Sequence, residues 1–411
     1  MSENSHDVLI IGAGLSGLAC ALKLQEQGKK VLILEKSDGP GGRVRTDKVD
    51  GFLLDRGFQV YLSAYPTAGQ LFDLPALELG HFEPGAMVYT RGKLHRVMDV
   101  FRQPQHLLAS VAAPIGRLLD KALVARLRLQ VKNSNQEAIA KREDLSTEDY
   151  LRRYGFSPRI IDGFFRSFYG GIFLERELQT SSRMFEFTFK MFSEGSATLP
   201  AMGMGELSCQ LANRLPKESI RYHCQVDKVS GNQVTLSSGD TLTAATVVLA
   251  TPAHITSKLL PGLGLSGLSW RSVTNLYFSA PQSPLNEAII ALNGTGEGLV
   301  NNVAVLSDVC PKYAPEGQAL ISVSLLGINK QKNLPSIIQK ELTEWFGKSV
   351  SEWNHLRTDL IPHALPNQNP QPPAFSDPEP PLYVCGDYLT SASIEGAVIS
   401  GQQAARKILE Q

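Results

Sequence analysis

The glycine hexad at residues 12–17 constrains this chain more than any other feature. The apolar run Val8–Ile11 precedes it, long enough for a buried parallel strand and too short for a helix. A helix with an apolar period follows and ends at Gly28, and residues 31–34 then predict a second strand that leads into Glu35. A glycine-rich turn between a strand and a helix, with an acid after the next strand, predicts a dinucleotide-binding βαβ unit.

Each glycine of the hexad has a physical role in such a unit. The three positions serve a tight turn, a close approach of the backbone to a pyrophosphate, and close packing of helix on strand. The helix N-terminus would present free N–H groups and partial positive charge to the phosphates. The carboxylate of Glu35 could accept hydrogen bonds from both ribose hydroxyls. The predicted contacts of this unit are Gly12, Ala13, Gly14, Leu15, Ser16, Gly17, Glu35 and Lys36.

A second hexad with the same spacing, at residues 262–267, serves as a control. It follows the segment Lys258–Pro261 and not a strand, and no βαβ unit comes after it. We therefore interpret it, and residues 294–298 likewise, as loops. The chain is expected to hold one dinucleotide site.

Composition narrows the class of protein. A chain of 411 residues exceeds one compact core, so two domains are expected, and 43% hydrophobic with 19% charged residues is ordinary for a soluble enzyme. The zero net charge argues against a nucleic-acid partner. Five scattered cysteines and eight histidines without ligand spacing predict a reducing compartment and no metal. The start of the chain lacks signal-peptide character, so we expect a cytoplasmic protein.

A second glycine-rich turn, residues 37–43, follows Glu35 closely. At this distance it can bring another backbone segment onto the same pyrophosphate, where Arg43 can neutralise phosphate charge through two parallel hydrogen bonds. A plain surface turn is the alternative. Beyond it, the chain alternates and then enters the small-residue segment Gly57-Phe58-Gln59-Val60.

Together, these segments resemble the flavin amine oxidase superfamily, which includes amine oxidases, protoporphyrinogen oxidases and phytoene desaturases. The resemblance returns at Gly386-Asp387, Ser393-Ile394-Glu395-Gly396-Ala397 and Ser400-Gly401, and there it is most similar to plant-type phytoene and ζ-carotene desaturases. It implies FAD, with Asp387 on the ribityl hydroxyls and the N-terminus of the last helix at the flavin ring. An ordinary C-terminal helix packed on a sheet is the alternative.

The resemblance also implies an α/β fold, in which an FAD-binding Rossmann-like (GR2-type) domain is joined to a discontinuous, mixed α+β substrate domain. The first domain is expected to comprise residues 1–65, 195–260 and 380–411, and the second residues 66–194 and 261–379. In the family, a strand near Val226 offers backbone groups to the adenine. Carried over residue by residue, the resemblance adds Gly42, Arg43, Gly57, Phe58, Val226, Asp387 and Ile394 to the predicted cofactor contacts.

The expected FAD is non-covalent. Relatives that hold the flavin covalently use a cysteine just ahead of the last helix, whereas Cys385 lies in the strand before Gly386. Amine oxidases of this family often place a lysine near flavin N5, yet the matching residues 299–303 contain none. The resemblance thus favours a polyene-like or porphyrinogen-like substrate over an amine, and we name no catalytic residue.

The middle of the chain predicts a substrate-binding region. Residues 89–95 predict a hairpin, and residues 105–130 a helix that either packs on its own domain or lies on an anionic bilayer. One face of that helix would carry Arg117, Asp120, Lys121 and Arg128, and the other Leu118, Leu119, Ala122, Leu123 and Leu127. Residues 164–192 are rich in aromatic side chains and would wall a tunnel for a long apolar substrate or fill the domain core. Within them, residues 183–192 fit a strand or a helix equally well.

The expected reaction is transfer of a hydride from a small apolar substrate to flavin N5. Because no second nucleotide site is predicted for NADPH, we expect reoxidation by oxygen or a quinone. Three alternatives stay open: a redox-neutral isomerase, an amine oxidase, and a non-catalytic FAD-binding subunit. Oligomeric state is not predicted.

Overall fold

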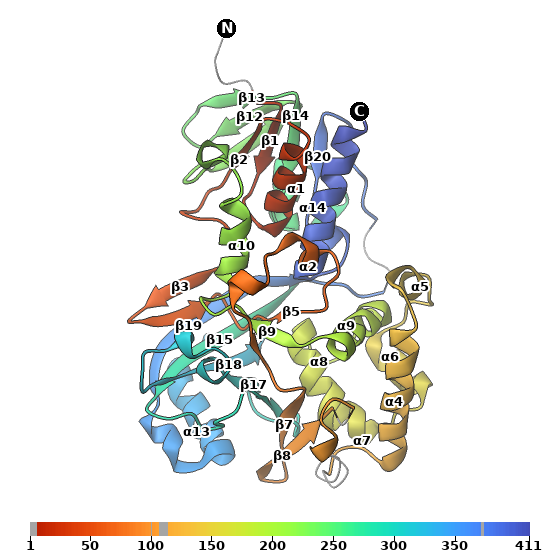
Figure 1. The fold of residues 1–411 in the computed structure, drawn as a ribbon, viewed down its shortest axis with the longest axis vertical. Helices are drawn as coiled ribbons and strands as arrows, with labels where there is room; N and C mark the ends of the chain where they lie inside the picture. Colours follow the sequence, from red (N-terminus) through yellow and green to blue (C-terminus); the bar gives the residue numbers. More distant parts are fainter. Residues whose placement is uncertain (1–5, 100, 107–113, 371–373) are drawn as a thin grey trace.

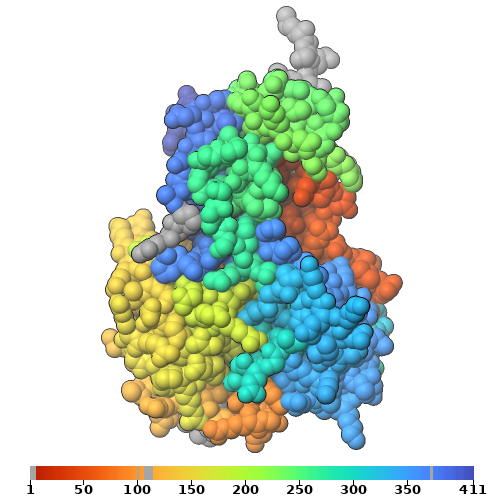
Figure 2. All heavy atoms as spheres, turned by 180° about the vertical axis from the view of Figure 1, so that it is seen from behind, coloured from red at the N-terminus to blue at the C-terminus, as the bar shows by residue number. Residues whose placement is uncertain are grey.

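The structure is a computed structural model and describes residues 6–99, 101–106, 114–370 and 374–411. A parallel sheet near both chain ends forms one part of the molecule, and a larger mixed sheet forms the other (Figure 1). The helical segment, α4 to α9 (residues 118–194), lies beside the larger sheet. From behind, the yellow part of the chain lies beside the light-blue part, and the red and green parts lie above them (Figure 2).

The parallel sheet carries the glycine hexad and joins three distant pieces of the chain. Its order is β10-β2-β1-β14-β20, so the first strand lies at its centre. Valine, isoleucine and leucine fill the two central strands because both faces of a parallel sheet are covered. The strands are β1 (Val8–Ile11), β2 (Val31–Leu34), β10 (Ile220–Arg221), β14 (Thr246–Leu249) and β20 (Leu382–Val384).

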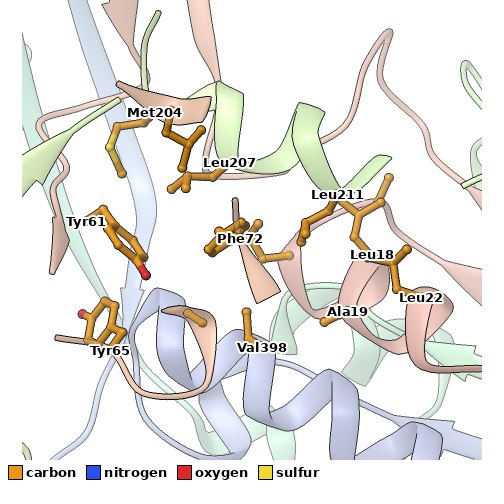
Figure 3. Close-up of a cluster of buried hydrophobic side chains, with 14 of the residues drawn as sticks. Leu18, Ala19, Leu22, Tyr61, Tyr65, Phe72, Met204, Leu207, Leu211 and Val398 are labelled. Atoms are coloured by element: carbon orange, nitrogen blue, oxygen red, sulfur yellow. The ribbon is translucent and has the colours of Figure 1, made fainter. Parts of the chain in front are cut away.

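Three helices cover one face of this sheet: α1 (Leu15–Gln25), α10 (Gly205–Ala212) and α14 (Ile394–Leu409). Their apolar side chains interlock in one buried cluster, to which Leu18, Leu211 and Val398 belong (Figure 3). The opposite face packs against the antiparallel strands β11 (Val226–Ser230), β12 (Gln233–Leu236) and β13 (Thr241–Thr243).

The strand expected near Val226 is β11, and residues 220–221 shortly before it form a separate strand, β10. β10 joins the parallel sheet, whereas β11 begins the antiparallel one. The chain turns between them at His223, whose φ of +55° lies in the left-handed region. This turn allows Cys224 N–H to donate a hydrogen bond to Glu35 O at 2.8 Å.

The larger sheet has seven strands in the order β19-β15-β18-β17-β16-β7-β8. One face packs on α13 (Leu334–Phe346), whose Ile338 and Leu342 are fully buried. The hairpin expected at residues 89–95 is confirmed, since Thr90 pairs with Lys93 across the β7–β8 turn. The strands are β7 (Gly85–Thr90), β8 (Lys93–Met98), β15 (Trp270–Ala280), β16 (Ile290–Asn293), β17 (Val300–Val305), β18 (Ala319–Leu326) and β19 (Asn354–Pro366).

The helical segment packs around its own aromatic cluster, which includes Phe165, Phe173 and Phe185. Residues 183–192, which fitted a strand or a helix, lie in a helix that Ser181 caps through a hydrogen bond from Arg183 N–H. The helices are α4 (Leu118–Lys132), α5 (Gln136–Ala140), α6 (Thr147–Tyr154), α7 (Pro158–Ile160), α8 (Arg166–Phe173) and α9 (Ser182–Glu194).

The expectation for residues 105–130 was wrong in its start and its faces. The helix begins at Leu118, and residues 107–113 lie outside the described residues. Leu118 and Leu119, which the packing alternative would place inward and the bilayer alternative outward, are 71% and 67% exposed, whereas Asp120, expected on the polar face, is buried. The reason is that the Asp120 carboxylate caps two segments, accepting from Arg117 N–H at 2.5 Å and Ser157 N–H at 2.8 Å.

Short elements complete the fold. They are the hairpin β3 (Thr46–Val49) and β4 (Phe52–Asp55), the strands β5 (Tyr61–Leu62), β6 (Gly80–His81) and β9 (Ala197–Leu199), and the helices α2 (Ala68–Leu71), α11 (Ala253–Leu259) and α12 (Leu306–Val309). Among the described residues, no helix is long and apolar enough to cross a membrane.

Candidate active site

The hexad turn shows why two of its glycines are required by packing and the third is not. A Cβ on Gly12, whose φ is +107°, would lie 2.8 Å from Ala250 O, and a Cβ on Gly17 would lie 2.1 Å from Gly12 O. A Cβ on Gly14 would meet no protein atom within 4 Å. Gly14 therefore borders open space at the N-terminus of α1. A pyrophosphate can approach the backbone closely there only if the residue has no side chain.

The second glycine turn lies directly against the first. Gly41 N–H donates to Ala13 O at 2.8 Å, and a Cβ on Gly42 would lie 3.6 Å from Gly14 Cα. The structure thus brings the two turns, about 28 residues apart, to one place. A plain surface turn, the alternative for residues 37–43, does not describe this contact.

Glu35 is buried at the end of β2 and already has three donors. Its Oε2 accepts from Ala13 N–H at 2.8 Å, and its Oε1 accepts from Ser37 N–H at 2.9 Å and Ser37 Oγ at 2.6 Å. A carboxylate offers about four acceptor positions. About one position is therefore left for a ribose hydroxyl, fewer than the two expected from sequence.

Arg43 and Asp387 come from opposite ends of the chain and form an ion pair. Arg43 Nη2 donates to Asp387 Oδ1 at 2.5 Å, and Nη1 donates to Ala364 O at 3.1 Å. The guanidinium also lies 5.5 Å from the ring centroid of Trp270. Sequence reasoning assigned Arg43 to a phosphate and Asp387 to the ribityl chain, and it missed that the two groups hold each other.

The C-terminal motif splits into residues that face a cavity and residues with a structural role. Ser393 caps α14 by accepting from Gly396 N–H at 2.9 Å, and the first helical residue, Ile394, lines the cavity described below. Glu395 is fully buried and accepts from Thr67 N–H at 2.9 Å and Ala68 N–H at 2.8 Å. Glu395 therefore caps α2, a structural role that the sequence motif did not reveal.

A single cavity of about 1250 Å³ joins these groups. Of the predicted contacts, Ala13 and Gly17 are turned into the protein and do not line it. The others do: Gly12, Gly14, Leu15, Ser16, Glu35, Lys36, Gly42, Arg43, Gly57, Phe58, Val226, Asp387 and Ile394. The cavity therefore passes from Val226, along both glycine turns, to the N-terminus of α14.

The same cavity continues between the helical segment and the larger sheet, where its walls are largely apolar. Of the aromatic residues expected to wall a tunnel or fill the core, Phe168 and Phe189 line the cavity, and Phe165 borders it with only 1% of its surface exposed. Phe187 does not line the cavity and stacks on Tyr65 with a centroid distance of 6.1 Å. Other apolar lining residues here are Ile115, Val124, Ile160, Phe164, Met184 and Phe192.

Charged groups lie where the cavity reaches α4. Arg128 forms an ion pair with Asp99, and Arg102 donates to Gly195 O at 2.7 Å and Ser196 Oγ at 2.8 Å. Phe101, 56% exposed, lies under the Arg128 guanidinium and also lines the cavity. This end is thus marked by arginines and an exposed aromatic ring.

Burial keeps the side chains of Cys385 and Tyr65 in their neutral forms. Burial raises the pKa of the Cys385 thiol to about 12, and Cys385 does not line the cavity. Burial also raises the pKa of Tyr65, which does line the cavity, well above its usual 10. Cys385 is accordingly a poor nucleophile for flavin attachment, and Tyr65 can act as a hydrogen-bond donor.

Comparisons with known proteins agree with this arrangement. The family model for "Flavin containing amine oxidoreductase" matches residues 15–409. A 15-cis-phytoene desaturase of Capsicum annuum is 22% identical over 98% of this chain and 78% of its own length. The L-amino acid oxidase Lm29 of Lachesis muta is 25% identical over 63% of this chain and 53% of its own. The solved cyclohexylamine oxidase of Brevibacterium oxydans superposes with a TM-score of 0.72 at 19% identity, covering 99% of each chain.

The names of these three relatives refer to three different substrates. The α/β fold expected from sequence is confirmed, and the flavin is FAD. The low identities mean that neither the sequence match nor the superposition selects one substrate.

Proposed function

Since this chain belongs to the flavin containing amine oxidoreductases, and is thus an FAD-dependent oxidoreductase, we propose that it removes a hydride from a largely apolar substrate of the polyene or porphyrinogen kind. The cavity carries this proposal, because it leads from the cofactor residues into a wall of aromatic and aliphatic side chains. Burial of apolar surface contributes about 25 cal/mol per Å², so a long substrate needs few polar anchors.

Among the described residues, three of the five carboxylates that line the cavity already have strong partners, which disfavours an amine at these positions; the other two, Glu83 and Asp227, accept only from neutral side chains. A bound ammonium group would need an anionic partner. Asp387 is paired with Arg43, Asp99 with Arg128, and Glu35 is held by its three donors. An amine would therefore compete with existing bonds at each of these three positions.

The residues of this chain would hold FAD by backbone and charge. Gly14 and Gly42 leave room for the pyrophosphate, and the N-terminus of α14 at Ile394 would stabilise negative charge on the reduced ring. Bound FAD supplies N5 as the acceptor of the hydride. The rings of Phe165, Phe168 and Phe189 would exclude water around the substrate. Oxygen or a quinone would then reoxidise the flavin.

Anaerobic mixing tests the reaction. The holoenzyme is incubated without oxygen with a polyene, a porphyrinogen and an amine, and flavin absorbance is followed. Bleaching by a polyene or porphyrinogen supports the proposal, and bleaching by the amine alone contradicts it. Turnover only after prior reduction of the flavin would instead identify a redox-neutral isomerase. Acid precipitation tests non-covalent attachment, which predicts that all flavin appears in the supernatant.

The exposed apolar residues of α4 favour peripheral contact with an anionic membrane. Leu118, Leu119 and Leu129 are exposed there, near basic side chains of the same helix, and Phe101 is exposed at the cavity lining. Such a surface suits a bilayer from which an apolar substrate could enter. Sedimentation with anionic vesicles checks this: the wild type should pellet, and a Leu118→Asp, Leu119→Asp variant should stay in solution with its FAD.

A further inference from the structure

The sheet face that borders the cavity carries a group of amide and hydroxyl side chains among apolar ones. The register of β15, β18 and β17 places Asn275 opposite Ser324 and Ser324 opposite Asn302. Directly opposed residues share a face of a sheet. Asn302 lines the cavity, and so does its apolar neighbour in register, Leu292. We call Asn275, Ser322, Ser324 and Asn302 the polar row.

All members of the polar row are buried, with at most 4% of their surface exposed. The Asn275 Oδ1 accepts from Ser322 Oγ at 3.1 Å and from Ser324 Oγ at 3.0 Å. Its Nδ2 has no hydrogen-bond partner among the described residues. A buried donor without an acceptor is costly, so this amide calls for an oxygen that the chain itself does not provide.

The cavity-lining member of the row has spare donor capacity as well. Asn302 Oδ1 accepts from Asn301 Nδ2 at 3.0 Å. Its own Nδ2 donates to Ser324 Oγ at 3.5 Å, the outer limit of such a bond. The row thus offers under-used N–H groups at and just behind the cavity wall.

The under-used donors of the row select a neutral ligand group. They are neutral amide N–H groups. A carboxylate bound there would bury a full negative charge without a cationic partner, and an ammonium group would meet donors in place of acceptors. A carbonyl or hydroxyl oxygen meets neither objection.

We propose that the polar row binds a neutral oxygen, a carbonyl or hydroxyl, of an otherwise apolar substrate and so orients it in the cavity. This deepens the proposed function and rests on it, because it assumes that an apolar substrate enters the cavity. A site built to hydrogen-bond an oxygen discriminates against the analogue that lacks it, since its buried donors then stay unpaired. Within the proposed substrates, this narrows the class to polyene-like hydrocarbons that carry a carbonyl or hydroxyl oxygen.

A matched pair of probes tests the inference on the holoenzyme. Cyclododecanone and cyclododecane are titrated from the same detergent, and binding is followed by the change in flavin absorbance. We expect the ketone to bind roughly tenfold more tightly than the hydrocarbon. The substitution Asn302→Leu should remove most of that tenfold preference and leave the affinity for cyclododecane unchanged.

Two further variants keep the experiment decisive. Should Asn302→Leu not retain FAD, Asn302→Ala replaces it, since it removes the donor without adding volume or charge, and Asn301 Nδ2 keeps its hydrogen bond to Ser167 O. The control is Leu292→Ala, which alters the apolar register neighbour of Asn302 and should weaken both probes alike.

The outcomes separate this inference from the proposed function. Equal binding of ketone and hydrocarbon by the wild type would overturn the role of the polar row and leave the apolar-substrate proposal intact. The same holds if Asn302→Leu weakened both probes equally. If neither probe bound, the apolar-substrate proposal would fall, and the role of the polar row would fall with it.

Discussion

The two ends of the cavity are built by different means: one end, with both glycine turns and Glu35, is the proposed nucleotide end, and the other, walled by residues 164–192, is the proposed substrate end. At the nucleotide end, positions are set by backbone: the two glycine turns touch through Gly41 N–H and Ala13 O, and Glu35 accepts from Ala13 N–H. At the substrate end, they are set by side-chain packing, as in the stack of Phe164 on Phe168 at 5.4 Å. Backbone contacts tolerate little variation, whereas a packed apolar wall can be rebuilt with other side chains.

The largest expected effect comes from adding a side chain at Gly14. In Gly14→Val, the new atoms have room within the protein but occupy the space of the pyrophosphate, so FAD binding should be lost while the fold is kept. Gel filtration with flavin absorbance and a thermal melt of the apoprotein check both points. Retained FAD would show that the hexad does not hold the cofactor.

The second hexad supplies the control for that prediction. Gly267 has open space around its Cβ position and no positive φ, so Gly267→Val should retain FAD. Gly264 is unsuitable, because its φ is +76° and a Cβ there would lie 2.0 Å from Ala374 O. Loss of FAD in Gly267→Val would remove the contrast between the two hexads.

The next effect concerns Asp55, whose hydrogen bonds connect it to three separate segments of the chain. Its carboxylate accepts from Met204 N–H at 3.0 Å and Tyr313 Oη at 2.9 Å, and its carbonyl accepts from Tyr277 Oη at 2.8 Å. Burial raises the pKa of this carboxyl from 3.8 to about 6. The folded state therefore holds a proton that the unfolded state has lost between about pH 4 and 6, and stability falls as pH rises through this window.

The variant Asp55→Asn should remove this pH dependence. Relative to the wild type, its free energy of unfolding should rise between pH 4 and pH 7 by up to about 3 kcal/mol, at about 1.4 kcal/mol for each unit of pKa shift. Urea denaturation at several pH values measures the difference. A constant difference across this range would mean that Asp55 titrates normally.

A smaller effect is expected for the ribose contact. In Glu35→Gln, the amide NH₂ must face either Ala13 N–H or the donors of Ser37, so one hydrogen bond becomes a clash of donors. FAD affinity should fall by about 1–3 kcal/mol. Equilibrium dialysis against FAD measures it, with Glu26→Gln on the surface as the control. Unchanged affinity would contradict the role of Glu35.

The smallest effect is expected at the substrate end. Phe168→Ala removes a ring that lines the cavity. Phe187→Ala removes a ring that does not line the cavity and that stacks on Tyr65. Phe168→Ala should weaken an apolar probe by about 1–2 kcal/mol and leave FAD affinity unchanged. Phe187→Ala should leave the probe affinity unchanged. If the two variants weakened the probe equally, the distinction between wall and core would fail.

The sequence predicted the nucleotide end well because its signals are local. The strand before Gly12, the helix after it and the acid after the second strand all lie within one βαβ unit. The family motif at Gly386-Asp387 and Ser393-Ile394 likewise depends on adjacent residues. The segment before the second hexad, residues 262–267, likewise showed that this hexad is a loop, since no strand precedes it. The domain boundaries stay a prediction.

Other features depend on residues that only the fold brings together. Glu395 caps α2 across 328 and 327 residues, and Arg43 pairs with Asp387 across 344. Asp120 determines which face of α4 points inward. Its carboxylate accepts hydrogen bonds from two backbone N–H groups, and Leu118 and Leu119 therefore lie outward.

The sequence by itself thus determined the βαβ unit, the flavin family and the cofactor, because glycine spacing and strand–helix order act over a few residues. Only the tertiary structure decided which phenylalanines face the cavity and which fill the core. Only it placed Asn302, Ser324 and Asn275 side by side from three strands. Hydrogen-bond partners and packing neighbours are matters of distance in space, and nothing in the local pattern of this chain encodes them.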